Sequence, residues 1–256
     1  MNVVVCVKQI PDPAVPGELD SDHTLKREGK LILDESDSYG VEMALQLVDK
    51  AGGGEVTLIS MAPNAEVSGL RTALAMGAAK AILVSDDALA GADALTTSKV
   101  LAKCVERAGD VDLVLTATES TDGYTGTIPA QIAELLGWPS LTFAKEVHLE
   151  GGTAKIQRQT EAGYDVVEAL LPAVVSVTAG VVEPRYPSFK GIMAAKSKPV
   201  DQVSTGDLGL APEAIAPNQT ITSVTAAPAR EAGEKIEDDG AAFEKVVEFL
   251  DGLKVI

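Results

Sequence analysis

VDLVLTATESTDGYTGTIPAQIAELLGWP, residues 111–139, places a strand, a loop of small residues and the start of a helix in immediate succession. Residues 112–117 form a short, mostly apolar run, which is typical of a strand in a parallel sheet covered on both faces. A helix that ends at Gly137 and Pro139 is predicted next, because apolar residues recur at helical spacing. These residues are Ile128, Ile132, Leu135 and Leu136. A strand, a loop and a helix in this order form the repeating unit of an α/β fold.

The loop in this stretch has the composition of an anion-binding turn. Residues 119–127 supply Ser, Thr and Asp side chains and two glycines, Gly123 and Gly126, so the backbone can approach a ligand closely and turn its N–H groups inward. The helix begins beyond the carboxyl end of the strand, where unpaired N–H donors and the helix dipole favour a phosphate. The stretch therefore predicts a nucleotide site, while an ordinary turn with a polar surface loop explains the same residues equally well.

A second corner of this kind is predicted near the start of the chain. Residues 2–8 are valine-rich, as a central parallel strand should be, and a polar excursion over residues 12–35 separates them from a helix. The first turn of that helix is acidic, and negative charge is favourable there. Its acidic residues are Asp34, Glu35 and Asp37. They are explained equally well as helix capping and as a corner that faces the same nucleotide.

Strands and helices alternate over the first half of the chain. Strands are predicted at residues 55–61 and 80–85, each followed by a helix. Residues 141–171 change to alternating polar and apolar stretches around a Gly-Gly pair, which indicates antiparallel strands that extend the edge of the sheet. The predicted architecture is a Rossmann-like, doubly wound α/β fold with a mostly parallel sheet, an antiparallel edge extension and a C-terminal partner-binding arm.

The composition shifts after residue 200. Residues 201–228 are rich in Ala, Pro, Thr and Ser and cannot bury much surface by themselves. The last segment, DDGAAFEKVVEFLDGLKVI, places apolar residues on one helical face, and a partner is favoured to cover it because an extended arm needs a surface to order it. We therefore expect a nucleotide-binding α/β domain over residues 1–182, an irregular segment over 183–200 and a C-terminal arm over 201–256.

Charge and cysteine content exclude several classes of protein. With 38 acidic and 21 basic residues the chain has a net charge of −17, which disfavours binding to nucleic acid and to anionic membranes. The two cysteines and two histidines have no metal-ligand spacing, so we expect a reduced compartment and no metal site. The N-terminal residues predict a strand rather than a signal peptide, and the longest apolar run, 169–182, is too short to span a bilayer. A cytoplasmic location is expected.

Motifs of common nucleotide-dependent enzymes are absent from the sequence. It contains no GxGxxG after the first strand, no GxxxxGK[ST] and no GxSxG. The loop over residues 119–127 offers no nucleophile with an adjacent base. A chain that holds a nucleotide without such groups is expected to be a binding or cofactor-carrying subunit, and not an enzyme in its own right.

Residues 183–199, EPRYPSFKGIMAAKSKP, closely resemble the signature of the electron transfer flavoprotein β-subunit family, although the leading Asn of that signature is not kept. The resemblance extends over essentially the whole chain, through VKQIPD near the start, RTALAMGA at residues 71–78, DLVLTATESTDGYTG and GWPSLTFA. It implies a heterodimer with an α subunit that holds most of the FAD, and an AMP with a structural role in the β subunit. In the electron-bifurcating branch of the family a second FAD takes the place of the AMP.

The same resemblance implies a function. The family's members accept electrons from acyl-CoA dehydrogenases of fatty acid β-oxidation and related dehydrogenases, and pass them to a membrane electron transfer flavoprotein:quinone oxidoreductase. Two alternatives stay open, namely a component of an electron-bifurcating flavoprotein and a stand-alone adenine-nucleotide-binding domain. The signature segment and the long arm argue against the stand-alone domain.

The resemblance also assigns nucleotide contacts to the first two strand ends, the acidic helix corner and the loop of the opening stretch. These residues are Cys6, Asp34, Glu35, Ser36, Asp37, Met61, Ala117, Thr118, Glu119, Ser120, Thr121, Asp122, Gly123, Tyr124, Thr125, Gly126, Thr127 and Ile128. Two departures from the family's pattern change the side chains offered to the nucleotide. The family's Asn-Pro at the helix corner is Asp34-Glu35 here, and its D-x-D-T-G loop reads DGYTG over residues 122–126. Backbone contacts are expected to persist.

Segment 183–200 resembles the loop by which the β subunit anchors an acyl-CoA dehydrogenase. Its candidate contact residues are Arg185, Tyr186, Phe189, Ile192 and Met193. The family's anchoring leucine falls on Phe189, and an exposed Phe can fill the same kind of apolar pocket. The alternative is that Phe189 staples the loop internally. A family glutamate that restrains the mobile flavin domain is replaced by Gln159 after Arg158, so that restraint is expected to be missing.

Overall fold

The structure is a computed structural model of the chain and describes residues 1–229, 233, 235–238 and 240–256. Its chain divides into two units, Met1–Thr222 and Ser223–Ile256, which are described separately.

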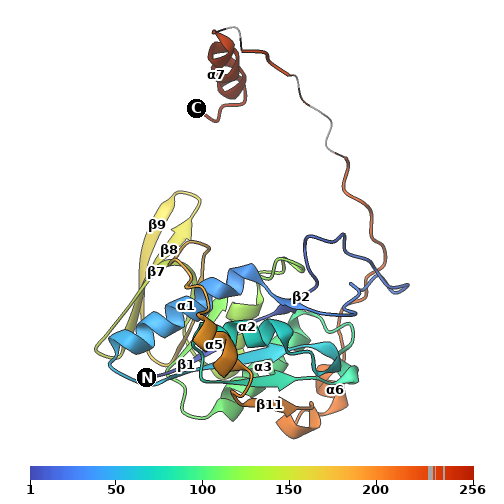
Figure 1. The fold of residues 1–256 in the computed structure, drawn as a ribbon, viewed down its shortest axis with the longest axis vertical. Helices are drawn as coiled ribbons and strands as arrows, with labels where there is room; N and C mark the ends of the chain where they lie inside the picture. Colours follow the sequence, from blue (N-terminus) through green and yellow to red (C-terminus); the bar gives the residue numbers. More distant parts are fainter. Residues whose placement is uncertain (230–232, 234, 239) are drawn as a thin grey trace. The chain divides into compact units, whose positions relative to one another are not determined.

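The first unit is built on one large, mostly parallel sheet (Figure 1). Among the described residues it has nine strands in the order β11-β5-β4-β1-β6-β10-β7-β8-β9. The seven parallel strands are β1 (Asn2–Cys6), β4 (Glu55–Met61), β5 (Lys80–Val84), β6 (Leu113–Ala117), β7 (Ser140–Glu150), β10 (Ala173–Val177) and β11 (Val200–Val203). The two antiparallel strands are β8 (Thr153–Thr160) and β9 (Gly163–Leu170). The predicted Rossmann-like α/β class is confirmed.

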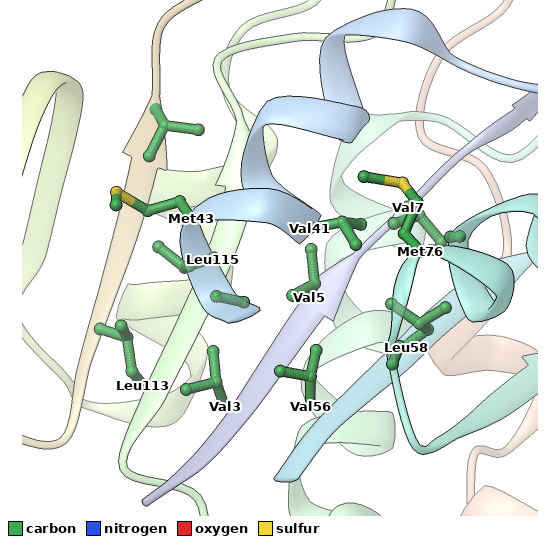
Figure 2. Close-up of a cluster of buried hydrophobic side chains, with 14 of the residues drawn as sticks. Val3, Val5, Val7, Val41, Met43, Val56, Leu58, Met76, Leu113 and Leu115 are labelled. Carbon is green, nitrogen blue, oxygen red and sulfur yellow. The ribbon is translucent and has the colours of Figure 1, made fainter. Parts of the chain in front are cut away.

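Helices cover both faces of the sheet and form a separate core on each. The main helices are α1 (Glu35–Lys50), α2 (Ser68–Met76), α3 (Ala94–Ala108) and α4 (Ile128–Leu136). Successive side chains of a strand point to opposite faces. Thus Val3 and Val5 of β1 pack with α1 and α2, as Figure 2 shows for Val41 and Met43 of α1, whereas Cys6 packs with α3 and α4.

The strand order creates a switch point beside β1. From β1 the chain runs to β4 and β5 on one side, then crosses to β6 on the other side, where Val4 of β1 pairs with Val114. Ligands of doubly wound sheets bind at the carboxyl ends of the strands at such a point. The loops that meet there are residues 7–34, after β1, and residues 118–127, after β6.

The antiparallel edge extension follows the predicted Gly-Gly turn. β7 leads into β8 through Gly151 and Gly152, whose φ angles are +58° and +79°. Glycine adopts positive φ without steric cost, so the pair forms a tight hairpin turn. β10 lies between β6 and β7 and joins the extension to the parallel strands.

The chain returns to the sheet after residue 200, where the composition predicted the start of an arm. β11 pairs with β5, and Leu208 and Ile215 are buried in the core on the α3 and α4 face. These few apolar residues need no core of their own because the sheet already supplies one. The remaining elements of this unit are β2 (Gln9–Ile10), β3 (Ile32–Leu33), η1 (Pro63–Ala65), η2 (Asp87–Leu89), α5 (Phe189–Ala195), η3 (Gly206–Leu208) and α6 (Pro212–Ile215).

The second unit contains the predicted terminal helix, α7 (Ala242–Gly252). Its large apolar side chains are exposed to solvent, including Phe243, Val246, Val247 and Phe249. Such a face is typical of a helix that packs against a partner, and that role stays a prediction. Within the described part of the chain, no helix combines the length and the apolar character that a membrane crossing requires.

Candidate functional site

Asp34 joins the start of α1 to the loop that follows β6. Its side chain is buried and caps α1, because Oδ1 accepts hydrogen bonds from the backbone N–H and the hydroxyl of Ser36, at 3.1 and 2.7 Å. Oδ2 accepts from the backbone N–H and the hydroxyl of Thr121, at 2.7 and 3.1 Å. The acidic corner therefore caps its helix, as one of the two explanations expected, and also holds the neighbouring loop, whereas contact with a nucleotide stays a prediction.

Asp122 is the centre of an ion-pair cluster at the same edge of the sheet. Lys8, which follows β1, donates from Nζ to Oδ1 of Asp122 at 2.6 Å and to the hydroxyl of Ser120 at 3.2 Å. Arg27, from the excursion between β2 and β3, donates from Nη2 to Oδ2. The side chain of Asp122 is only 7% exposed. Burial raises the pKa of this carboxyl, but the two cations outweigh burial and hold the pKa below its ordinary value.

Asp37 has the opposite electrostatic balance. Its Oδ2 accepts a hydrogen bond from the backbone N–H of Lys8 at 2.6 Å. Burial raises its pKa well above the ordinary value, and Asp34 and Asp122 add to the rise. Two neighbouring carboxyl groups thus differ in the protonation state that the site favours, because only Asp122 has cations paired with its oxygens.

The backbone of the loop offers hydrogen-bond donors to an anion. Tyr124 donates its N–H to the carbonyl of Ser120 at 2.9 Å, and positive φ angles of +47° at Tyr124 and +69° at Gly126 turn the chain toward α4. No described residue accepts from the N–H groups of Gly126, Thr127 or Ile128. These groups precede and begin α4, where the helix dipole is positive. The geometry is suited to a phosphate or a carboxylate.

Gly123 allows a close approach within this loop. A Cβ at this position would lie 3.2 Å from the Ser120 hydroxyl and 3.6 Å from Nζ of Lys8. A side chain here would crowd the Ser120 hydroxyl, to which Nζ of Lys8 donates, and would reach ordinary van der Waals contact with Nζ itself. The glycine therefore relieves crowding inside the loop at Ser120.

The structure brings together some of the predicted nucleotide contacts and separates others. Those joined in one hydrogen-bonded network are Asp34, Ser36, Asp37, Glu119, Ser120, Thr121 and Asp122, linked in part through Lys8. Glu35, Tyr124, Thr125 and Thr127 are exposed, and of these Tyr124 donates its backbone N–H to Ser120 of the network. Cys6 and Met61 instead direct their side chains into the core on the α3 and α4 face, where burial raises the pKa of the Cys6 thiol. Ala117 is buried, Ile128 packs against the core on the α3 and α4 face, and Thr118 and Gly126 are half-buried.

Two residues of the site were not predicted from the sequence. Lys8 lies within VKQIPD at the end of the first strand, and that position at the predicted binding edge was the signal that could have identified it. Arg27 lies in an excursion without hydrophobic periodicity, and 95 residues separate it from Asp122. A single sequence holds no local pattern that could reveal that pairing.

Arg185 is engaged inside this chain. Its Nε donates to Oε2 of Glu42 at 2.6 Å, its Nη2 to Oε1 at 3.0 Å, and its backbone N–H to Oε2 at 3.2 Å. The Glu42 side chain, on α1, is 4% exposed. Burial raises the pKa of Glu42, but its bonds to Arg185 and Gln46 hold that pKa below the ordinary value. Arg185 therefore ties segment 183–200 to α1, a contact that the sequence-based assignment to partner recognition did not include.

Helix α5, which carries most of the other predicted contact residues, is held against α2 by close packing and by side-chain hydrogen bonds. A Cβ at Gly191 would lie 2.4 Å from the carbonyl oxygen of Ala75, so only glycine permits this packing of α5 on α2. Nη1 of Arg71 donates to the carbonyls of Ala195 and Lys198 at 2.6 and 2.7 Å. Nζ of Lys198 donates in return to the carbonyls of Leu74 and Ala78, at 2.9 and 2.6 Å. Arg71 of α2 thus bonds to carbonyls at and just beyond the end of α5, and Lys198, three residues after α5, bonds to carbonyls at and just beyond the end of α2.

An exposed apolar patch lies on α5 and the residues just before it. Tyr186 is 93% exposed and Phe189 is 81% exposed, while Ile192 and Met193 are about half exposed at 47% and 51%. The exposure of Phe189 does not fit an internal staple of the loop. The four residues, which we call the α5 patch, have the composition of an interface anchor.

The fold and these groups define a doubly wound α/β protein with a polar, charged binding edge at its switch point and a separate exposed apolar patch. A family profile described as "Electron transfer flavoprotein domain" matches residues 22–208. The electron transfer flavoprotein subunit beta of Mycobacterium tuberculosis (strain H37Rv) is 40% identical over 264 residues, which cover 100% of this chain and 99% of the relative. The corresponding subunit of Megasphaera elsdenii is 34% identical over 270 residues, with 100% of both chains covered.

A third relative has a different name. The "Caffeyl-CoA reductase-Etf complex subunit CarD" of Acetobacterium woodii is 38% identical over 240 residues, which cover 92% of each chain. With similarity of this extent, the chain belongs to the electron transfer flavoprotein family and is related to its β subunits.

Proposed function

We propose that this chain is the β subunit of a heterodimeric electron transfer flavoprotein. In this proposal FAD is shared with, and mostly held by, an α subunit. The FAD accepts electrons from acyl-CoA dehydrogenases and related dehydrogenases, and these electrons then pass to a membrane quinone oxidoreductase. The observation that carries the proposal is the similarity over the full length of the chain to proteins named as subunits beta of such flavoproteins. The redox chemistry belongs to the flavin, so the chain is an electron carrier subunit and not an enzyme by itself.

An AMP is the proposed occupant of the edge formed by the loops after β1 and β6. The unpaired N–H groups of Gly126, Thr127 and Ile128 and the start of α4 suit its phosphate. The side chains of Asp34 and Asp122 are already paired within the chain, so they hold the loop while the backbone supplies the donors. This division explains how backbone contacts can persist although side chains in the loop depart from the family's pattern.

The α5 patch is the proposed docking point for the dehydrogenase. Phe189 stands at the first residue of α5, exposed on a helix whose position is set by Gly191 and Arg71. An aromatic anchor on a rigid base loses little conformational entropy on binding, which is the usual character of an interface hot spot. Arg185 supports this surface from within the chain through Glu42.

The C-terminal unit is the proposed contact with the α subunit. The exposed apolar face of α7 would be covered by that partner. Of the three regions expected from the sequence, residues 1–182 are the proposed nucleotide-binding domain and residues 183–200 are the proposed recognition segment. The binding arm corresponds to the unit that begins at Ser223, because residues 200–216 contribute strand β11 and buried side chains to the sheet.

A second candidate is supported by the relative from Acetobacterium woodii, whose name places it in a complex of a reductase with an Etf. This chain would then be a component of an electron-bifurcating flavoprotein, with a second FAD in the AMP site. The two candidates differ in the nucleotide that the β subunit holds. A stand-alone nucleotide-binding domain is the third possibility, and a chain that stays folded and nucleotide-loaded without any α subunit would support it.

The test is chromatography of the nucleotides released when the purified complex is denatured, quantified per mole of complex. One FAD and one AMP support the electron carrier. Two FAD without AMP support the bifurcating component. A complex that releases no nucleotide beyond the FAD of the α subunit would overturn the assignment of the loop over residues 117–128.

A further inference from the structure

Residues 11–31 form a strap between β2 and β3. The two short strands pair at Gln9 with Leu33 and at Ile10 with Ile32, which brings the ends of the strap together. Within the strap, the N–H of Lys26 donates to the carbonyl of Glu18 at 2.9 Å. The strap is thus a folded hairpin and not an open loop.

The strap is attached at its ends to the β2–β3 pair and to α2, and it has little core of its own. Leu31 is fully buried, and its carbonyl accepts a hydrogen bond from the Ser68 hydroxyl on α2. By contrast, residues 12–22 are exposed. A segment with so few buried contacts depends on individual polar contacts for its position.

Arg27 makes the contact between the strap and the candidate nucleotide loop. Its Nη2 donates to Oδ2 of Asp122, and its Nη1 donates to the carbonyl of Gln9 at 3.3 Å. Among the hydrogen bonds of the described residues, the bond to Asp122 is the only one that joins residues 11–31 to residues 117–128. Arg27 is 28% exposed, so the ion pair is partly shielded from water.

Asp122 is held from two directions. Lys8 fixes one of its oxygens from the end of β1, and Arg27 fixes the other from the strap. Two residues after Tyr124, the loop supplies the unpaired N–H groups that begin at Gly126. The orientation of those donors therefore depends on a carboxylate whose second partner is contributed by the strap.

We propose that Arg27 is a positioning residue for the nucleotide site, which holds the loop over residues 117–128 in its binding-competent shape by clamping Asp122. The inference rests on the nucleotide site of the proposed function and assigns a role to a residue that no motif marks. Preorganisation of a binding loop acts mainly on the dissociation rate, because a loosened loop releases its ligand faster. The bound nucleotide should consequently stay longer when Arg27 is present.

The test measures release of radiolabelled AMP from the purified heterodimer into an excess of unlabelled AMP. Arg27→Ala should accelerate release by about tenfold, as expected for the loss of one charged hydrogen bond that is partly exposed. Arg27→Lys should restore part of the wild-type rate, because it keeps the charge but not the forked geometry. Lys26→Ala is the matched control, since Lys26 pairs with Glu18 inside the strap and its side chain has no bond to the loop. Its release rate should stay within about twofold of wild type.

A double-mutant cycle and hydrogen exchange separate this role from a general loss of stability. In an Asp122→Asn background, Arg27→Ala should add little to the release rate, since the clamp is already open. Backbone exchange should rise in residues 117–128 of Arg27→Ala and stay unchanged in β5. Equal effects of Arg27→Ala and Lys26→Ala, or additive effects in the cycle, would overturn the proposal. If the complex binds no AMP, the proposed occupant of the site is wrong. Hydrogen exchange over residues 117–128 then tests the role of Arg27 by itself, and exchange that is unchanged in Arg27→Ala overturns that role.

Discussion

Glu42→Gln is the substitution that most directly tests how segment 183–200 is held. Glu42 lies in α1 and is buried, and its two carboxylate oxygens accept the three hydrogen bonds donated by Arg185. Gln has nearly the same shape as Glu but carries no charge and has one acceptor oxygen. The change therefore weakens the tie between α1 and the segment without opening a cavity.

The expected magnitude follows from burial of the pair. Hydrogen bonds to charged groups contribute about 1.5–3 kcal/mol. Arg185 is 41% exposed and can recover hydration once Glu42 is neutral, so the loss should lie near the lower end. We expect the local opening free energy of residues 183–189 to fall by about 1–2 kcal/mol, which corresponds to an increase of about five- to thirty-fold in amide exchange in that segment.

The assay is hydrogen exchange of the purified heterodimer, read by mass spectrometry of peptides from residues 183–189. Asp49→Asn is the matched control, because Asp49 lies 3.9 Å from Nη2 of Arg185 but is 74% exposed. An ion pair of that kind contributes little, so exchange should change by no more than about twofold. Equal exchange in Glu42→Gln and Asp49→Asn would refute the reasoning.

The ion pair between Glu42 and Arg185 also predicts that the effect of Glu42→Gln on stability depends on pH. The folded-state pKa of Glu42 lies below its ordinary value, so its contribution to stability is complete above the unfolded-state pKa, about 4.3. That contribution is lost as the pH falls through the folded-state pKa. The difference in thermal stability between wild type and Glu42→Gln should therefore narrow below about pH 4. A difference that stays constant into acid would show that the carboxylate charge is not its source.

Three further predictions concern the α5 patch and the binding edge. Phe189→Ala should reduce electron transfer from the dehydrogenase by about tenfold or more while flavin content and heterodimer yield stay unchanged; a loss of folding would contradict the interface role. Gly191→Ala should raise amide exchange across α5 and weaken dehydrogenase docking, because its Cβ would lie 2.4 Å from the Ala75 carbonyl oxygen; a crystal structure with α5 undisplaced would contradict this. Asp122→Asn should lower the melting temperature by a few degrees at neutral pH, roughly the effect of 1–2 kcal/mol. Because the folded-state pKa of Asp122 is lowered, this difference should shrink as the pH falls below the unfolded-state pKa of about 3.9, and a difference that grows in acid would be contrary to the assignment.

Local signals in the sequence accounted for the elements and for the main architecture. The succession of strand, loop and helix over residues 111–139, the acidic cap at Asp34 and the Gly151-Gly152 turn each depend on neighbours in the chain, and the structure confirms them. The family signature over residues 183–199 likewise lies in one continuous segment. Periodicity and capping are short-range effects, so a single sequence records them.

Composition was a poor guide where a segment joins a core that already exists. Residues 201–216 look too polar and too rich in small residues to fold alone, yet β11 pairs with β5 and Ile215 is buried. The free energy of burying one side chain depends on the surface that receives it, and that surface is formed by residues far away in the sequence.

The sequence by itself determined where the main strands and helices before residue 182 lie, where the terminal helix lies and to which family the protein belongs. Only the tertiary structure decided which charged groups meet. Lys8 and Arg27 reach Asp122 across 114 and 95 residues, and Arg185 reaches Glu42 across 143. Charged side chains at strand ends and in loops follow no period, so nothing local marks their partners. Those partners are set by the strand order, which brings the ends of β1 and β6 together and lays α1 beside the segment that carries Arg185.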